Sequence, residues 1–143
     1  MIIPSKQYAQ IIEVLPILCV DIIIQNAHHE YLLIKRINEP RKEQWWVIGG
    51  RVLKGEVLEQ AAIRKVKEEV GLKANNMHPI GYYEDTFEIN PFGNPTPLHS
   101  VSVVFKTFVD DFQSITLDSQ SSDWKYSKEL PKDFILKPFS NNL

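Results

Sequence analysis

Residues 50–72 read Gly-Arg-Val-Leu-Lys-Gly-Glu-Val-Leu-Glu-Gln-Ala-Ala-Ile-Arg-Lys-Val-Lys-Glu-Glu-Val-Gly-Leu, and this stretch decides the fold. Its apolar side chains repeat at close to the helical period, at Leu58, Ala62, Val66 and Val70. Gly71 stands where a glycine often ends a helix, because the left-handed backbone needed there suits glycine best. The stretch therefore predicts a glycine-bearing loop that enters one long helix over residues 56–70.

The far end of this predicted helix is acidic. Glu68 and Glu69 are adjacent, about 100° apart around the helix axis. Arg64 precedes Glu68 by four residues, so the two can pair along the helix surface. Mg²⁺ prefers oxygen ligands and commonly takes one or two carboxylates together with phosphate oxygens. A pair of acids alone is typical of a solvated helix face, so the interpretation depends on the wider spacing.

The wider spacing resembles the Nudix box, whose pattern is Gly-x5-Glu-x7-Arg-Glu-U-x-Glu-Glu-x-Gly-U with U aliphatic. The matching positions are Gly50, Glu56, Arg64, Val66, Glu68, Glu69, Gly71 and Leu72. The resemblance implies an α+β fold, the Nudix α/β/α sandwich around a mixed β-sheet. It also implies a Mg²⁺-dependent hydrolase of a nucleoside diphosphate linked to another group, with Mn²⁺ as the alternative ion. The residues with structural roles in the box would be Gly50, Glu56, Arg64 and Gly71.

One position of the box departs from the pattern. Lys65 stands where the family has a glutamate that is often a metal ligand and can serve as base. Position 65 lies three and four residues before Glu68 and Glu69, on their face of the helix. A charged ammonium cannot bind Mg²⁺ and would repel an ion held nearby.

More of the chain is similar to the GDP-mannose mannosyl hydrolases, a Nudix family that also lacks this glutamate. The similarity runs through residues 16–21, 31–36 and 45–51 and becomes patchier beyond residue 72. It implies substitution at the anomeric carbon of a nucleotide sugar such as GDP-mannose, with release of the sugar and GDP.

The same resemblance implies a metal site. The Gly49 backbone carbonyl, the Glu69 carboxylate and the Gln120 side-chain oxygen would hold the ion. Glu68 is a further carboxylate at this end of the helix, so it is a candidate both for the metal and for catalysis.

Substrate binding would fall to two arginines and a tyrosine. Arg36 and Arg51 would hold the diphosphate leaving group and assist catalysis, since guanidinium donates bidentately to phosphate and keeps its charge. Tyr8 is a candidate to stack on the nucleobase, although packing of its own helix is the alternative role.

The C-terminal half departs from this closer family at the residues that matter most. Ser121 follows Gln120 where that family has its general base, a histidine, and a serine of ordinary acidity cannot act as base near neutral pH. Ser100 stands where a tyrosine assists the leaving group. The base would then be Glu68 or a metal-held water, with His99 as a weaker candidate.

Two alternative functions stay open. One is a phosphorus-attacking pyrophosphohydrolase of a nucleotide such as ADP-ribose or a nucleoside triphosphate, which the retained Glu68 favours. The other is a sensor that binds a nucleotide sugar without hydrolysing it, which Lys65 and Ser121 favour.

Length and charge narrow the class of protein. The 143 residues suit one domain over residues 1–143, and the net charge of −2, with both signs mixed, argues against a general nucleic-acid binder. The longest apolar stretch is interrupted by charges and predicts no membrane span. We therefore expect a cytoplasmic protein with a small nucleotide as its partner, and a homodimer stays open. Cys19 lies in an apolar run and is expected to be a buried, inert thiol.

The remaining elements follow from alternation and turn residues. Ser5 is expected to cap a helix over residues 6–14, and residues 17–25 and 31–37 are expected to form a hairpin. Further strands are predicted over residues 45–48, 80–89, 99–109 and 124–126, and loops over residues 38–44, 90–98 and 110–122, before a tail at 131–143.

Overall fold

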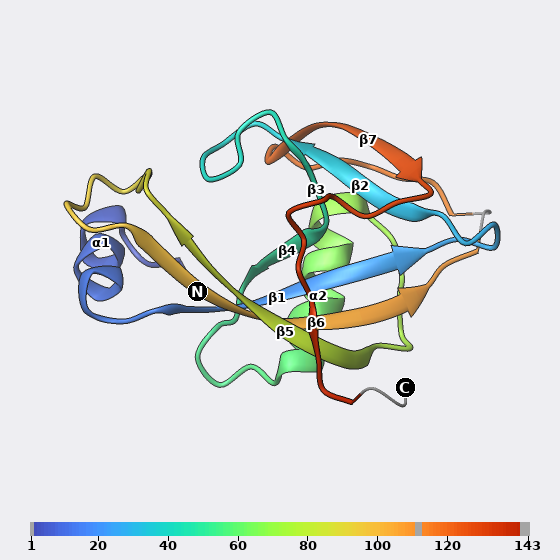
Figure 1. The fold of residues 1–143 in the computed structure, drawn as a ribbon, viewed down its shortest axis with the longest axis horizontal. Coiled ribbons are helices and arrows are strands. Elements are labelled where there is room, and N and C mark those ends of the chain that lie inside the picture. The colour runs from blue at the N-terminus through green and yellow to red at the C-terminus, as the bar shows by residue number, and fades with distance from the viewer. Residues whose placement is uncertain (1, 111–112, 141–143) are drawn as a thin grey trace.

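The computed structural model describes residues 2–110 and 113–140. The chain forms two helices and eight strands within these ranges (Figure 1). In chain order they are α1 (Ser5–Val14), β1 (Ile17–Gln25), β2 (Tyr31–Arg36), β3 (Trp45–Trp46), β4 (Ile48–Arg51), α2 (Leu58–Val70), β5 (His78–Phe87), β6 (Leu98–Phe108), β7 (Ser121–Ser127) and β8 (Lys137–Pro138).

The strands form one mixed sheet. Its order is β3-β2-β1-β6-β5-β8, with β4 paired to β1 and β7 paired to β2. β1 runs parallel to β6 along its whole length, from Ile17 opposite Ser100 to Gln25 opposite Phe108, whereas the other pairs are antiparallel. The predicted fold class, α+β around a mixed sheet, is confirmed.

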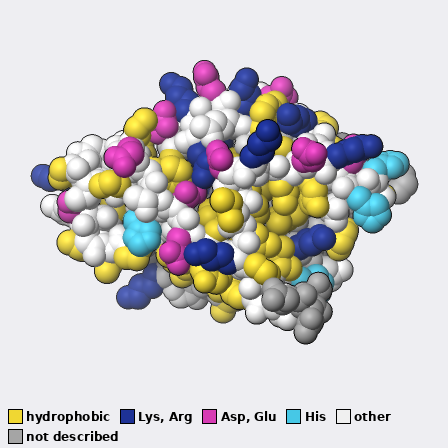
Figure 2. Space-filling model, in the orientation of Figure 1, with side chains coloured by type: hydrophobic (Ala, Val, Ile, Leu, Met, Phe, Trp, Pro, Cys, Tyr) yellow, Lys and Arg dark blue, Asp and Glu magenta, His cyan; other side chains and the backbone are white. Residues whose placement is uncertain are grey.

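Two cores cover the two faces of the sheet. On one face α2 packs its small and β-branched residues against β1, β2 and β4, and the fully buried members include Val20, Ile22, Ile34, Ile48, Ala62 and Val66. On the other face the C-terminal segment crosses the strands (Figure 1), and Phe134 packs edge-on against Trp46 and Tyr83. Figure 2 shows the hydrophobic side chains gathered on this face, ringed by charges of both signs.

The helices differ from prediction mainly at their N-terminal ends. Ser5 is already inside α1, and Pro4 takes the capping position without a side-chain hydrogen bond, so the predicted serine cap is wrong. The long helix begins at Leu58, two residues after the predicted start, because Val57 is still extended. Its predicted end is confirmed, since Gly71 has a φ of 72° and its N–H donates to the Lys67 carbonyl.

The strand predictions fail where pairing is long-range. β1 and β2 pair only at Gln25 and Tyr31, because β2 turns away to join β7, so the predicted hairpin exists only at its tip. The predicted strand 45–48 is interrupted at Val47, and β8 has no counterpart among the predicted elements. No helix in the described part of the chain is long and apolar enough to cross a membrane.

Candidate active site

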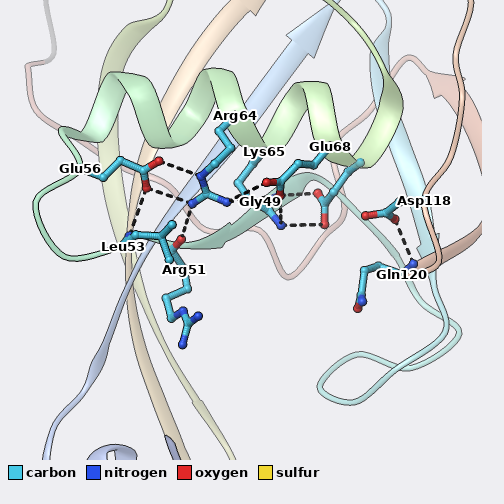
Figure 3. A network of polar contacts seen from close by, with 10 residues as sticks. Gly49, Arg51, Leu53, Glu56, Arg64, Lys65, Glu68, Asp118 and Gln120 are labelled. Atoms are coloured by element: carbon cyan, nitrogen blue, oxygen red, sulfur yellow. Dashed lines mark hydrogen bonds and ion pairs between the residues drawn. The ribbon is translucent and has the colours of Figure 1, made fainter. Parts of the chain in front are cut away.

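Arg64 is the centre of a closed polar network at the start of the box (Figure 3). Its Nε donates to Glu56 Oε2 at 2.7 Å, and its Nη2 donates to the Arg51 carbonyl at 3.0 Å. Glu56 also accepts from the Leu53 N–H at 3.1 Å, which closes the glycine loop onto the helix. The hydrogen bond from Arg64 lowers the pKa of Glu56 below its ordinary value. The loop before α2 is thus fixed by hydrogen-bond donors and acceptors that pair with one another.

The two glycines of β4 lie in close contact with neighbouring side chains, without an unusual backbone. A Cβ at Gly49 would lie 1.7 Å from Asp21 Oδ1 and 2.6 Å from the Val20 carbonyl oxygen, so only glycine fits there. A Cβ at Gly50 would lie 2.4 Å from Lys65 Cε, so a larger residue there would displace the far end of the lysine.

The acidic end of the helix carries a lysine between its two glutamates. Lys65 Nζ lies 3.5 Å from Glu68 Oε2 and 3.8 Å from Glu69 Oε1. Arg64 Nη1 also contacts Glu68 Oε2 at 3.2 Å, so the Glu68 carboxylate has two cationic neighbours. Glu68 nevertheless keeps 48% of its side chain exposed, whereas the side chain of Glu69 is only 4% exposed.

Glu69 is the unusual carboxylate of the site. It accepts one hydrogen bond from the Gly49 N–H at 3.2 Å. Burial raises its pKa to about 7, with Lys65 opposing the rise and Asp118 adding to it. A buried carboxylate with one hydrogen bond and a second acid nearby is stabilised by an added positive charge.

Asp118 and Gln120 belong to the segment that precedes β7, and this segment lies beside the acidic end of α2 (Figure 3). The Gln120 N–H donates to Asp118 Oδ1 at 2.9 Å, and Gln120 Oε1 accepts from Asn38 Nδ2 at 3.1 Å. Asp118 was not selected from the sequence, because nothing in a polar loop indicates that it folds back toward Glu69. The only hint is its position two residues before Gln120.

A cavity of about 710 Å³ lies on the other side of β4 residues Gly49 and Gly50 from the Lys65 contact, and Glu68 and Glu69 are not among the residues that line it. Six residues selected from the sequence do line it, namely Tyr8, Arg36, Gly49, Gly50, Arg51 and Gln120. They come from α1, β2, β4 and the segment before β7, so the fold brings together residues that lie up to 112 positions apart.

The two arginines are held differently in this wall. Arg36 Nε donates to the Pro40 carbonyl at 2.8 Å, which ties it to the loop after β2. The Arg51 guanidinium lies over the Tyr8 ring, 4.7 Å from its centre, and Tyr8 meets Phe92 edge-on at 4.8 Å. Tyr8 therefore both packs its helix and reaches the cavity.

The cavity also contains a buried acid that sequence reasoning missed. Asp21 is 6% exposed and accepts a short hydrogen bond from the Tyr83 hydroxyl. Burial raises the pKa of Asp21 to about 6. A lone aspartate inside the apolar strand 17–25 was the available signal. Cys19, expected in the core, also lines the cavity, and burial raises the pKa of its thiol to about 12.

A second missed group is an ion pair on an aromatic surface. Arg41 Nη2 lies 2.7 Å from Asp85 Oδ2, and the Arg41 guanidinium covers the Trp46 ring at 3.6 Å from its centre. Arg41 lies in a charged loop that offered no pattern, and Asp85 stands between Glu84 and Thr86 on β5, so the sequence gave no sign that the two pair.

His99, the weaker base candidate, is exposed on β6 and is not among the residues that line the cavity. Ser121, which follows Gln120, is buried, and its hydroxyl has no hydrogen-bond partner among the described residues. Ser100 does line the cavity.

Comparison with known proteins identifies the family. The model of the NUDIX domain matches residues 15–134. The chain belongs to the Nudix hydrolase family. The low-salt glycan biosynthesis protein Agl8 of Haloferax volcanii is 30% identical over 125 residues, which cover 86% of this chain and 78% of that protein. An ADP-ribose pyrophosphatase of Methanocaldococcus jannaschii is 38% identical over 90 residues, which cover 63% of this chain and 49% of that protein.

Solved structures carry the same fold. A MutT NUDIX hydrolase from Burkholderia pseudomallei superposes with a TM-score of 0.67 at 21% identity, over 82% of this chain and 88% of that one. The NUDIX domain of Shewanella oneidensis NrtR, solved with ADP ribose, gives 0.63 at 23% identity, over 79% and 73%. At these identities the likeness establishes the Nudix fold alone.

The donor set can be tested against the divalent ion that the Nudix family implies. No three His, Cys, Asp or Glu side chains gather at metal-binding distances within residues 2–110 and 113–140. The candidates are instead mixed oxygens: the Gly49 carbonyl, the buried Glu69 carboxylate and the Gln120 amide. Oxygen donors of this kind suit a hard divalent ion, and the buried Glu69 carboxylate is the donor that an added positive charge would stabilise. Gln120 Oε1 accepts from Asn38 Nδ2, so it would exchange this hydrogen bond for the ion.

Proposed function

We propose that this Nudix protein is a divalent-metal-dependent hydrolase of a nucleotide sugar, with GDP-mannose as the first substrate to test. The observation that carries the proposal is the shared cavity. Arg36, Arg51, Gly49 and Gln120 line it together with the polar pairs Asp21–Tyr83 and Arg41–Asp85. A diphosphate needs the arginines and the metal donors, and a polyhydroxylated group beside it suits the polar pairs.

The polar residues beyond the arginines favour a sugar as the linked group. Asp21 with Tyr83 and Arg41 with Asp85 present fixed donors and acceptors next to the aromatic rings of Trp46 and Phe87. Sugars offer hydroxyl groups for such partners and apolar C–H surfaces for aromatic rings. The relative Agl8 carries glycan biosynthesis in its name, which agrees with this substrate class.

Each site residue has a role in the proposal. Gly49, Glu69 and Gln120 hold Mg²⁺ or Mn²⁺, which supplies neutralisation of charge that develops on the diphosphate. Arg36 and Arg51, which line the same cavity, bind this diphosphate as well, since their guanidinium groups stay charged throughout. Tyr8 is the residue best placed to contact the nucleobase, because it lines the cavity beside Arg51.

Product analysis over a substrate panel tests this proposal. Purified protein with Mg²⁺ is incubated with GDP- and UDP-sugars, ADP-ribose and a nucleoside triphosphate, and products are separated by ion-exchange chromatography. We expect a nucleoside diphosphate and free sugar from at least one nucleotide sugar, and no reaction in chelator. Hydrolysis confined to ADP-ribose or the triphosphate, or tight binding with no hydrolysis, would contradict the proposal.

A second candidate is a pyrophosphohydrolase that attacks phosphorus. It is favoured by Glu68, the carboxylate that the mannosyl hydrolases lack, and by the relative named as an ADP-ribose pyrophosphatase. In this structure Arg64 and Lys65 both pair with Glu68, which leaves this carboxylate less available as a base. We therefore rank this candidate second.

A further inference from the structure

Lys65 occupies an unusual place for a lysine on a charged helix. Its side chain is only 16% exposed, whereas Lys67, two residues further along the same helix, is exposed. The ammonium lies within 4 Å of both glutamates of the box, at 3.5 Å from Glu68 and 3.8 Å from Glu69. A long, flexible lysine normally extends into water, so this position needs a cause.

Gly50 supplies the cause. The Lys65 stem crosses β4 so closely that a Cβ at Gly50 would lie 2.4 Å from Cε and 3.0 Å from Nζ. Gly50 has no positive φ, so its backbone does not require glycine. The glycine of the box therefore makes a groove in which the lysine side chain lies, and the groove directs the ammonium to the carboxylates.

We propose that Lys65 is a tethered cation that occupies the place of a second divalent ion and limits this protein to a one-metal site. This inference rests on the proposed metal-dependent function. The ammonium balances the negative charge between Glu68 and Glu69 and holds Glu68 away from the metal donors. The exchangeable ion then binds on the other side of Glu69, with Gly49 and Gln120.

The proposal predicts how metal binding responds to the charge at position 65. Wild-type protein should bind one Mn²⁺ per chain, measured by titration with electron paramagnetic resonance of the free ion. Lys65→Glu should bind a second Mn²⁺, because it adds a carboxylate where the ammonium lay. Lys65→Met should bind its one Mn²⁺ at least about tenfold more tightly than wild type, because a positive charge that repels the ion is removed. Lys67→Met is the matched control and should behave as wild type.

A double-mutant cycle tests the groove without metal or activity. Gly50→Ala should lower the melting temperature of metal-free protein slightly when Lys65 is present, because the new methyl displaces the end of the lysine from its contacts with Glu68 and Glu69. The same substitution in a Lys65→Ala background should cost much less, because the stem is gone. An equal loss in both backgrounds would contradict the tethered position of Lys65.

The two possible failures are distinguishable. If wild type binds one Mn²⁺ and the position-65 variants bind it with unchanged affinity and stoichiometry, the tethered-cation inference is wrong and the metal site stands. Binding of two Mn²⁺ by wild type would also contradict the tethered-cation inference, and it would leave the metal-dependent function standing. If wild type and every variant bind no Mn²⁺, the metal-dependent function fails, and this inference fails with it.

Discussion

The two ends of the Nudix box differ in how well their charges are balanced. At the loop end, Glu56 receives two hydrogen bonds from Arg64 and one from Leu53. At the acidic end, Glu69 receives one hydrogen bond from Gly49, while Lys65 stands 3.8 Å away. The pKa of Glu56 is accordingly lowered by its arginine, and the pKa of Glu69 is raised to about 7 by burial.

This difference shows which glutamate stabilises the fold and which belongs to the candidate site. A carboxylate whose pKa is lowered stabilises the fold as it stands, and nothing further has to bind. A buried carboxylate whose pKa is raised costs stability when it is charged, and it recovers that cost only with a cation. Two glutamates of one sequence motif therefore have opposite thermodynamic roles.

The largest expected effect is loss of activity on removal of the Glu69 charge. Glu69→Gln keeps the shape of the side chain but removes the anionic ligand proposed for the metal. We expect hydrolysis to fall about 10³-fold, comparable to the loss of one strong transition-state contact, and Mn²⁺ binding to weaken in calorimetry. Glu59→Gln, on the exposed side of the same helix, is the control. Hydrolysis that continues undiminished in chelator would show that the reaction needs no metal, and it would contradict the role of Glu69 as a metal ligand.

The second effect is on stability against pH in metal-free protein. The pKa of Glu69 is about 7 in the folded state against an ordinary 4.5, so its contribution is fully present below pH 4.5 and is lost as pH rises to 7. This loss amounts to about 3 kcal/mol in the free energy of unfolding. The free energy of unfolding is measured by urea denaturation for wild type and for Glu69→Gln at each pH, and the difference gives the contribution of Glu69. The subtraction removes the contribution of Asp21, whose pKa is also raised. A difference that is flat with pH would contradict the burial of an unbalanced charge.

Glu56 should show the opposite sign of pH dependence. Its pKa is lowered in the folded state, so its contribution is present above its ordinary value and is lost as the pH falls. Arg64→Met removes the partner and should reduce the free energy of unfolding by about 2 kcal/mol at neutral pH, because Glu56 and the Arg51 carbonyl lose their donors. Lys67→Met should stay within about 0.5 kcal/mol of wild type. Equal stability of both variants would mean that the loop end is not a closed network.

The smallest expected effects concern the two arginines that line the cavity. Arg36→Ala or Arg51→Ala should each lower turnover about tenfold and change KM less, since charge on the leaving diphosphate grows in the transition state. Arg51→Ala retains the backbone carbonyl that Arg64 uses, so the box should stay folded. Wild-type turnover in the double variant would assign both arginines to surface charge.

Sequence reasoning succeeded where local pattern decides structure. The apolar run from Ile17 to Gln25 predicted β1 to the residue, and Gly71 ends α2 as a C-terminal glycine should. The motif spacing selected the residues of both ends of the box, because a helix fixes where neighbours three and four positions apart lie.

The remainder required contacts between distant segments. The parallel pairing of β1 with β6 and the crossing of the sheet by the segment around Phe134 leave no local pattern. Asp118 and Asp85 were missed for the same reason, since each gains its partner from another element. Lys65 was identified as a departure from the motif, but only the groove at Gly50 explains where its charge lies.

Isotope labelling in ¹⁸O-water tests the proposed chemistry most directly. The protein is incubated with GDP-mannose and Mg²⁺ in labelled water, and the products are weighed by mass spectrometry. Attack at the anomeric carbon puts the label in free mannose and leaves GDP unlabelled, and this is the result that we predict. Label in GDP, in a nucleoside monophosphate or in a sugar phosphate would instead establish attack at phosphorus and contradict attack at the anomeric carbon.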